Sequence, residues 1–221
     1  MRKINIAIDG PAGSGKGTVA KRVARELDYL YIDSGAMYRL LSYLIIKNNI
    51  DLQEDEKIRD ILINEFDYVV EDDKVYFGNQ DVTDKIRSKE VNEIVSIVAG
   101  KQYVRDFLIS LQKEIASEKG VVMDGRDITS VVLKDAELKI YLDASFEERV
   151  KRRYKEELKK KNDITRDEVG RIIYSRDYRD EKINKTLVRA NDSVLVDTTN
   201  TTIEEAVERV LELAKERINN D

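Results

Sequence analysis

Residues 10–18 read Gly10-Pro11-Ala12-Gly13-Ser14-Gly15-Lys16-Gly17-Thr18 and lie between an apolar segment and an amphipathic one. Before them, Ile4, Ile6 and Ile8 alternate with other residues, a pattern that predicts a β-strand. After them, apolar residues recur at the spacing of one helix face, at Val19, Ala20, Val23, Ala24 and Leu27. The sequence therefore predicts a strand, a glycine-rich loop and a helix in immediate succession.

The loop matches the pattern GxxxxGK, with Gly-Thr after the lysine. Glycines let successive backbone N–H groups turn toward phosphate oxygens, and the start of the following helix adds partial positive charge. We predict that residues 10–18 bind the phosphates of ATP, that Lys16 reaches the terminal phosphates, and that the Thr18 hydroxyl faces magnesium. An ordinary glycine-rich turn is the alternative, but the flanking strand and helix favour the phosphate loop.

Four further apolar segments predict strands, at residues 29–32, 121–124, 138–143 and 193–197. Together with the first strand they end at or next to an aspartate: Asp9, Asp33, Asp124, Asp143 and Asp197. Helical segments separate the strands, which predicts a parallel sheet with ligands at its carboxyl edge. We therefore expect the α/β class, as a P-loop three-layer fold with a central five-stranded parallel sheet. Asp9, Asp143 and Asp197 could instead cap helices or turns.

Residues 66–83 have a different character, because three short apolar segments are separated by Glu71-Asp72-Asp73 and Gly78-Asn79. Such separators are typical of turns and predict a small antiparallel insert. A long helix is expected from roughly Ser88 to Glu118. Ser145 with Glu148, and Thr202 with Glu205, have the spacing of capping boxes that open two further helices.

Composition excludes several classes of chemistry. The 221 residues include no Cys and no His, so disulfides, thiol nucleophiles, Ser-His-Asp triads and histidine metal sites are excluded. The net charge of −5 argues against a dedicated nucleic-acid binder. No segment has the length of a membrane helix or the form of a signal peptide, so we expect a soluble, cytoplasmic protein.

Two motifs follow predicted strands and are expected to face the phosphate loop. Residues 33–39 read Asp-Ser-Gly-Ala-Met-Tyr-Arg, and residues 124–127 read Asp-Gly-Arg-Asp. Arg39 and Arg126 can each bind a phosphate with two hydrogen bonds, and Ser34 and Asp127 can read the edge of a base. A GTPase would need an Asn-Lys-x-Asp motif late in the chain, but Leu187 stands where that aspartate belongs.

The chain resembles bacterial-type cytidylate kinases over essentially its whole length. The resemblance rests on six stretches that follow one another in this order: GPAGSGKGT, DSGAMYR, the insert, IRSKEVNEIVS, DGRDI and SRDYRD. The resemblance implies transfer of the terminal phosphoryl group of ATP to CMP or dCMP, with magnesium. It implies one kinase domain with a core at about residues 1–35, 119–148 and 190–221. An acceptor-binding lobe would comprise about residues 36–118, and a helical lid about residues 149–185.

The same resemblance implies roles for individual residues. Ser34, Ser96, Arg105 and Asp127 would contact the cytosine, Arg39 and Arg126 the acceptor phosphate, and Arg176 and Asp180 the sugar. Tyr38 is either a base stacker or a core residue, with neither favoured. We expect the catalytic groups to be Lys16, Arg126, Arg153 and Arg176.

One departure from the family pattern concerns the end of the lid. Where the family has an Arg and a Pro-Leu pair, this chain has Ile183 and Thr186-Leu187, so Lys182 or Lys185 would have to replace the missing Arg. Residues 149–182 contain 13 Lys or Arg against 8 Asp or Glu. We interpret Arg153, Arg176 and Arg179 as phosphate contacts of the lid, and Lys155 and residues 159–161 as a solvated charged surface.

This inventory suits phosphoryl transfer, which depends on positioning and positive charge more than on proton transfer. The main hypothesis is an ATP-dependent (d)CMP kinase, acting as a monomer with no nucleic-acid or membrane partner. Two alternatives stay open: a kinase that prefers UMP or AMP, and a nucleotide-binding regulator that transfers nothing.

Overall fold

A computed structural model describes residues 2–71, 74–159 and 163–219. The chain divides into two compact units, one formed by residues 1–33 and 115–221 and the other by residues 34–114.

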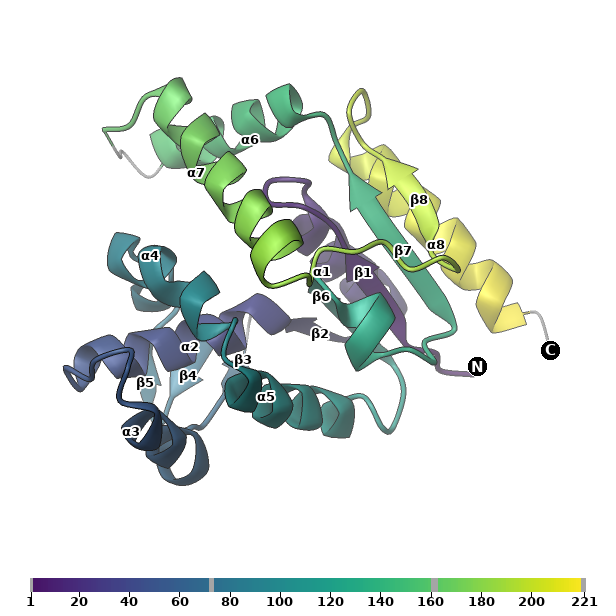
Figure 1. Ribbon diagram of the computed structural model, residues 1–221. Coiled ribbons are helices and arrows are strands. Elements are labelled where there is room, and N and C mark those ends of the chain that lie inside the picture. Colours follow the sequence, from purple (N-terminus) through teal and green to yellow (C-terminus); the bar gives the residue numbers. More distant parts are fainter. Residues whose placement is uncertain (1, 72–73, 160–162, 220–221) are drawn as a thin grey trace. The chain divides into compact units, whose positions relative to one another are not determined.

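The first unit is built on a five-stranded parallel sheet, as the sequence predicts. The strands are β1 (Ile6–Asp9), β2 (Leu30–Asp33), β6 (Val121–Gly125), β7 (Leu138–Asp143) and β8 (Val194–Asp197). They lie in the order β2-β6-β1-β7-β8, so β1 is central and the phosphate loop leaves the middle of the sheet (Figure 1). All four pairings are parallel, which confirms the α/β class.

Two helices and the sheet share one apolar core. Helix α1 (Lys16–Leu27) packs against α8 (Ile203–Asn219), and both contribute to a cluster with β1, β6, β7 and β8. Burial of this cluster is the main stabilising contribution, because each fully buried aliphatic side chain adds about 1.5–3 kcal/mol. The capping box at the start of α8 is confirmed, since Thr202 N–H donates to Glu205 and Glu205 N–H donates to Thr202.

The predicted aspartates stand at or next to the carboxyl ends of the strands, and three of them bind nearby backbone. The carboxylate of Asp9 accepts hydrogen bonds from the N–H groups of Ile128 and Thr129 at 2.8 Å each and from the Thr129 hydroxyl at 2.6 Å. It thereby fixes the short helical turn η3 (Ile128–Val132). Burial raises the pKa of Asp9, and these three donors oppose that shift. Asp143 and Asp197 likewise accept from backbone N–H groups.

The predicted lid segment forms α6 (Phe146–Lys159), α7 (Arg166–Tyr178) and the turn η4 (Arg179–Ile183). Val150 on α6 and Val169 and Ile173 on α7 pack with Ala12 of the phosphate loop. The predicted capping box of α6 is only half present. Glu148 N–H donates to Ser145 Oγ at 3.3 Å, but Ser145 N–H donates to Thr199 instead of Glu148, whose carboxylate binds Lys151 and Arg152.

The second unit contains the predicted insert and more helix breaks than expected. The insert is an antiparallel sheet of β3 (Val69–Glu71), β4 (Lys74–Phe77) and β5 (Gln80–Asp81), so this prediction is confirmed. The turn predicted at Asp72-Asp73 lies outside the described residues. Helix α2 (Ser34–Lys47) begins directly after β2, and α3 (Asp55–Asp60) and η1 (Ile61–Glu65) precede the insert.

The helical stretch predicted from Ser88 to Glu118 is helical over most of its length, but it is not one helix. The chain instead forms the turn η2 (Lys85–Arg87), then α4 (Lys89–Val98) and α5 (Gln102–Ile115). At the end of α4, Gly100 N–H donates to Ile97 O and Lys101 N–H donates to Val98 O. These bonds to the third preceding residue tighten the last turn and end the helix, although apolar periodicity continues through the break.

Within the described ranges, no helix combines the length and apolar character needed to cross a membrane.

Candidate functional site

Three glycines of the phosphate loop, Gly10, Gly13 and Gly15, occupy positions that disfavour other residues. Gly13 and Gly15 have φ angles of 78° and 92°, in the left-handed region. A Cβ atom on Gly10 would lie 2.1 Å from the carbonyl oxygen of Leu142 on β7, which means that the loop backbone runs directly against that strand. The sequence-predicted loop therefore has the backbone that its glycines were expected to permit.

The start of α1 presents the charge expected of an anion site. Gly15 is the N-cap, and no side chain caps the first turn, so its N–H groups remain directed outward from the helix end. Lys16 lies in this first turn and is buried, and its Nζ donates to the carbonyl oxygen of Pro11 at 3.2 Å. The ammonium group of Lys16 thus lies against the backbone of the loop with which it is expected to bind phosphate.

Several charged groups act on Lys16. Burial lowers its pKa most; Arg126 and Arg176 lower it further, whereas Asp124 and Asp33 act to raise it. The pKa of Asp124 shifts the other way, because burial and the neighbouring Asp33 carboxylate raise it. The first unit therefore gathers three cationic side chains and two carboxylates around the phosphate loop. Cations that repel one another in a buried region are stabilised by a bound anion.

Arg126 and Asp180 form a buried ion pair beside this cluster. Arg126 Nε donates to Asp180 Oδ2 at 2.8 Å, and the two side chains are only 15% and 9% exposed. Burial is the largest single influence and acts to lower the pKa of Arg126, but Asp180, Asp177 and Asp124 together raise the pKa above its usual value. Arg176 Nε lies 4.0 Å from the same carboxylate oxygen. Three sequence-predicted site residues, Arg126, Arg176 and Asp180, therefore come together.

Thr186 explains one departure from the family pattern. It is buried, its N–H donates to the carbonyl oxygen of Asp180 at 2.8 Å, and its hydroxyl donates to the same oxygen at 3.2 Å. A proline could make neither bond. Thr186 therefore holds the backbone of Asp180 by two hydrogen bonds that a proline at this position would lack. Ile183, at the other departure, is 63% exposed and offers no charge.

Two residues that the sequence analysis did not single out hold the phosphate loop to the lid helices. Asp177 of α7 accepts a hydrogen bond from Ala12 N–H at 3.0 Å, and Arg149 of α6 donates to Ala12 O at 2.9 Å. Arg149 and Asp177 also form an ion pair with each other. A single charged pair thus holds Ala12 of the loop by both its backbone N–H and its backbone carbonyl oxygen.

We expect Asp177→Ala to lower the free energy of unfolding by about 2 kcal/mol. It removes the partner of a largely buried Arg149 and leaves Ala12 N–H without its acceptor; the partial exposure of the pair keeps the loss below that of a fully buried one. Urea unfolding measures the change. Asp167→Ala, at an exposed position of the same helix, is the control. Equal stabilities of the two variants would show that the pair does not hold the loop.

Arg152 provides a second brace for the loop. Its Nη1 donates to Ser14 O at 3.0 Å and to the hydroxyl of Thr198 at 2.9 Å. The Thr198 hydroxyl in turn contacts Ser14 O at 3.3 Å. The basic character of residues 149–182 is therefore used partly to shape the loop rather than only to meet a ligand.

Arg153, predicted as a catalytic group, binds its own helix in this structure. Its guanidinium pairs with Glu156 at 3.1 Å and with Glu157 at 2.7 Å. A phosphate contact would require these pairs to be exchanged, so the role of Arg153 stays a prediction. Lys155 and Lys159 are exposed, in agreement with a solvated surface, whereas positions 160 and 161 lie outside the described residues.

In the second unit, the predicted acceptor residues lie on α2, α4 and α5. Ser34 and Arg39 of α2 and Ser96 of α4 are buried polar residues, and Arg39 Nη1 donates to Asn92 Oδ1 at 2.5 Å. Because α2 packs against α4, these groups belong to one pair of helices. Arg105 on α5 and Tyr38 are partly buried, so neither role proposed for Tyr38 is excluded.

Two carboxylates beside Lys16 are better candidates for holding a magnesium ion than the Thr18 hydroxyl is. Thr18 is exposed, whereas the Cβ position of Gly17 lies 3.8 Å from each oxygen of Asp124. Magnesium in nucleotide sites is usually held by one or two carboxylates with phosphates and water. Asp124 and Asp33 provide such carboxylates. Among the described residues there is no group of three or more acidic side chains that could hold a metal ion by themselves.

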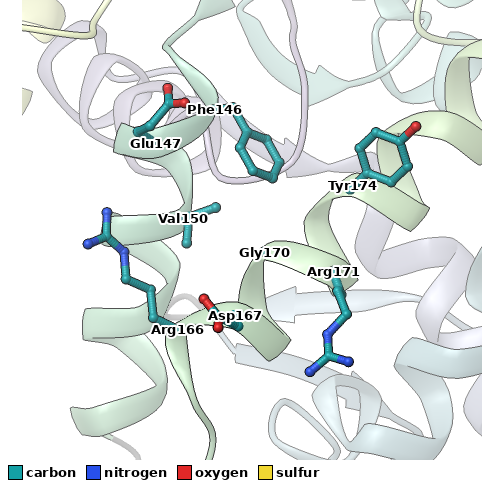
Figure 2. Close-up of a pocket in the computed structure, with 8 residues that line it drawn as sticks. All are labelled: Phe146, Glu147, Val150, Arg166, Asp167, Gly170, Arg171 and Tyr174. Atoms are coloured by element: carbon teal, nitrogen blue, oxygen red, sulfur yellow. The ribbon is translucent and has the colours of Figure 1, made fainter.

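The groove between α6 and α7 lies elsewhere on the first unit. Figure 2 shows Phe146, Glu147 and Val150 on one side, and Tyr174 and Arg171 among the residues on the other. None of the residues that line it is a predicted site residue, so it provides no support for the phosphate site.

The residues missed from the sequence share one property. Arg149, Arg152 and Asp177 act on the backbone of a loop that is more than a hundred positions away. The only signal for Asp177 was its place in the motif SRDYRD, and the only signal for the two arginines was the basic character of their segment.

Comparison with known proteins gives the following matches. The family model described as cytidylate kinase matches residues 6–216. The cytidylate kinase of Fusobacterium nucleatum subsp. nucleatum is 45% identical over 208 residues, covering 94% of this chain and 95% of that protein. That of Ligilactobacillus salivarius is also 45% identical, covering 98% of this chain and 99% of that protein.

A solved structure supports the fold alone. The gluconokinase of Sinorhizobium meliloti 1021 aligns with a TM-score of 0.52 at 15% identity, over 99% of this chain and 97% of that one.

Proposed function

The chain belongs to the cytidylate kinase family and is an ATP-dependent CMP kinase, and we propose that Lys16, Arg126 and Arg176 carry its phosphoryl transfer. The observation that supports this assignment is the convergence of the three cations beside the phosphate loop, where Arg126 and Arg176 both lower the pKa of Lys16. Such a cluster can stabilise the negative charge that is spread over the three equatorial oxygens of the phosphoryl group during its transfer.

The proposed reaction begins with ATP on residues 10–18. Backbone N–H groups of the loop and of the first turn of α1 bind the β- and γ-phosphates, and Lys16 exchanges its contact with Pro11 O for the terminal phosphates. An oxygen of the CMP phosphate forms a bond to the γ-phosphorus, while the bond from that phosphorus to the bridging oxygen breaks and ADP leaves. That acceptor oxygen is already anionic at neutral pH, so no histidine is required.

The roles proposed for the acceptor are those that the family resemblance implies. Arg126 and Arg39 bind its phosphate, Arg176 and Asp180 its sugar, and four residues its cytosine: Ser34, Ser96, Arg105 and Asp127. The buried Arg126–Asp180 pair supports the first of these roles, because a guanidinium already held on one side presents its remaining N–H groups in a fixed direction.

Magnesium, when bound, neutralises charge on the β- and γ-phosphates. We propose that Asp124 faces it from β6, with Thr18 as the weaker candidate because its side chain is exposed. Use of dCMP, a monomeric state, a cytoplasmic location and the division into core, lobe and lid stay predictions.

The test is ADP formation from ATP and magnesium in the presence of CMP, dCMP, UMP or AMP. We expect CMP and dCMP to give the highest rates. No acceptor-dependent ADP would favour the non-catalytic regulator, and a higher rate with AMP than with CMP would overturn the cytosine assignment.

Ser14 provides a separate prediction about the loop. Its Oγ is the one buried side-chain oxygen or nitrogen for which the described residues offer no hydrogen-bond partner. We expect Ser14→Ala to raise the free energy of unfolding by about 1 kcal/mol, because an unsatisfied buried hydroxyl is removed. We expect ATP affinity to fall about tenfold, because a hydrogen bond to a charged phosphate is lost.

Ser42→Ala is the matched control, since the buried Ser42 hydroxyl already donates to Tyr38 O at 2.8 Å. It should lose stability and keep ATP affinity. Unfolding in urea and calorimetric titration with ATP measure both quantities. An unchanged ATP affinity in Ser14→Ala would contradict a phosphate contact by this hydroxyl.

A further inference from the structure

Residue 17 lacks a side chain at a position where phosphate loops of the pattern GxxxxGK[ST] carry a hydroxyl. In those loops the Ser or Thr that follows the lysine binds magnesium. Here Gly17 holds that position, in the first turn of α1. A Cβ atom built on Gly17 would lie 3.4 Å from the Tyr31 hydroxyl and 3.8 Å from each oxygen of Asp124. The oxygens that face this side of the loop therefore come from β2 and β6.

The strand register explains why Tyr31 and Asp124 meet. Tyr31 on β2 is paired with Val122 on β6, and Asp124 lies two residues further along that strand. Side chains two residues apart point to the same face of a sheet, so the Tyr31 ring extends along the face that carries Asp124. Its hydroxyl donates to Asp124 Oδ1 at 2.8 Å.

The Tyr31 ring is held by more than this hydrogen bond. It packs against the core cluster shared by α1, α8 and the sheet. A donor on a packed, two-torsion side chain has little freedom, so the direction of the Asp124 carboxylate is determined by the fold rather than by the ligand. Gly17 leaves the space for this arrangement open, because it has no side chain of its own there.

We propose that Tyr31 is a positioning residue for the metal end of the nucleotide site. Its phenol orients the Asp124 carboxylate beside Gly17. The oriented carboxylate thereby takes the place of the hydroxyl that residue 17 supplies in other phosphate loops. This inference rests on the proposed function of the phosphate loop and on the role of Asp124 within it.

The test is calorimetric titration of the full-length protein with ATP, in EDTA and over a series of magnesium concentrations, without any acceptor. For Tyr31→Phe we expect unchanged ATP affinity in EDTA. We expect the magnesium concentration that gives half of the affinity gain to rise about tenfold, because a hydrogen bond to a charged group is lost. In steady-state assays kcat should fall while the KM for CMP stays the same.

Tyr29→Phe is the matched control. The Tyr29 hydroxyl accepts a hydrogen bond from Ile4 N–H at 3.1 Å, and its ring packs on the same core cluster. Loss of the Tyr29 hydroxyl should lower the unfolding temperature and leave the magnesium dependence of ATP binding unchanged. This control separates the structural effect of removing a phenol from an effect on the position of Asp124.

Rescue provides the sharpest measurement. A Cβ atom at Gly17 meets neighbours only at ordinary van der Waals distances, and Tyr31→Phe removes the nearest of them, so we expect Gly17→Ser to fit in that background. In the Tyr31→Phe background, Gly17→Ser should restore the wild-type magnesium dependence. Wild-type magnesium dependence in Tyr31→Phe, or a loss that Gly17→Ser does not restore, overturns the proposal. Because ATP binding is measured without an acceptor, failure of the kinase assignment would appear instead as absent CMP-dependent ADP formation in the wild-type protein.

Discussion

Replacing Lys16 by alanine is expected to lower kcat with CMP by about 10³-fold, because the only lysine in the loop that can neutralise the terminal phosphates is removed. Lys16 is buried in the first turn of α1, and its present partner is the carbonyl oxygen of Pro11. When Lys16 leaves that contact, Pro11 O still accepts a hydrogen bond from Ser14 N–H at 3.4 Å. A coupled assay of ADP formation measures the effect.

Lys21→Ala, five residues further along the same helix, is the control and should keep the wild-type rate. Burial lowers the pKa of Lys16, which means that its charge opposes folding at neutral pH. The Lys16→Ala variant should therefore unfold at a temperature similar to that of the wild type. A near-normal rate in a folded Lys16→Ala variant would show that the loop does not bind the transferred phosphate.

Replacing Arg126 by alanine is expected to lower kcat/KM for CMP by about 10²- to 10³-fold, because a buried guanidinium directed at the acceptor phosphate is lost. The variant should also lose about 2–3 kcal/mol of stability, since Asp180 is left without its partner at 2.8 Å. Steady-state kinetics with varied CMP and unfolding in urea measure the two effects.

A double variant separates them. Arg126→Ala with Asp180→Ala removes both partners of the ion pair, so stability should return toward the wild-type value. CMP kinetics should stay impaired, because the proposed contacts of both residues with CMP are lost, which would show that the kinetic loss is not a result of lower stability. Arg209→Ala, in an exposed pair with Glu212 on α8, should change neither quantity by much. Unchanged CMP kinetics in Arg126→Ala would refute the role of this residue.

The predictions that succeeded depend on local patterns. The phosphate loop, the strands that end near aspartates and the capping box of Thr202 and Glu205 each follow from residues within a few positions of one another. Backbone conformation and capping are decided at that range, so sequence patterns report them well. The prediction for residues 88–118 missed the break near Gly100, because the apolar periodicity of α4 and α5 continues across that break almost undisturbed.

The lid segment illustrates a different limit. Its positive charge is visible in the sequence, from which we predict phosphate contacts for Arg153, Arg176 and Arg179 and no role for Arg149 and Arg152. In the structure Arg149 and Arg152 bind carbonyl oxygens of the loop, and Arg153 binds glutamates of its own helix. A guanidinium has five N–H donors and can donate to phosphate, carboxylate or carbonyl oxygens. The positive charge of the segment alone therefore could not show which arginine binds which partner.

By itself, the sequence determined that a glycine loop joins a strand to a helix, that five strands form a parallel sheet, and that Lys16 stands at the end of the helix next to the loop. Only the tertiary structure decided what surrounds that end: Asp177 on the peptide of Ala12, Thr186 on the backbone of Asp180, and Tyr31 on Asp124 above Gly17. The physical reason is range. Ala12 and Asp177 are 165 positions apart, and their hydrogen bond exists because the sheet and lid helices pack together, which no local pattern of residues encodes.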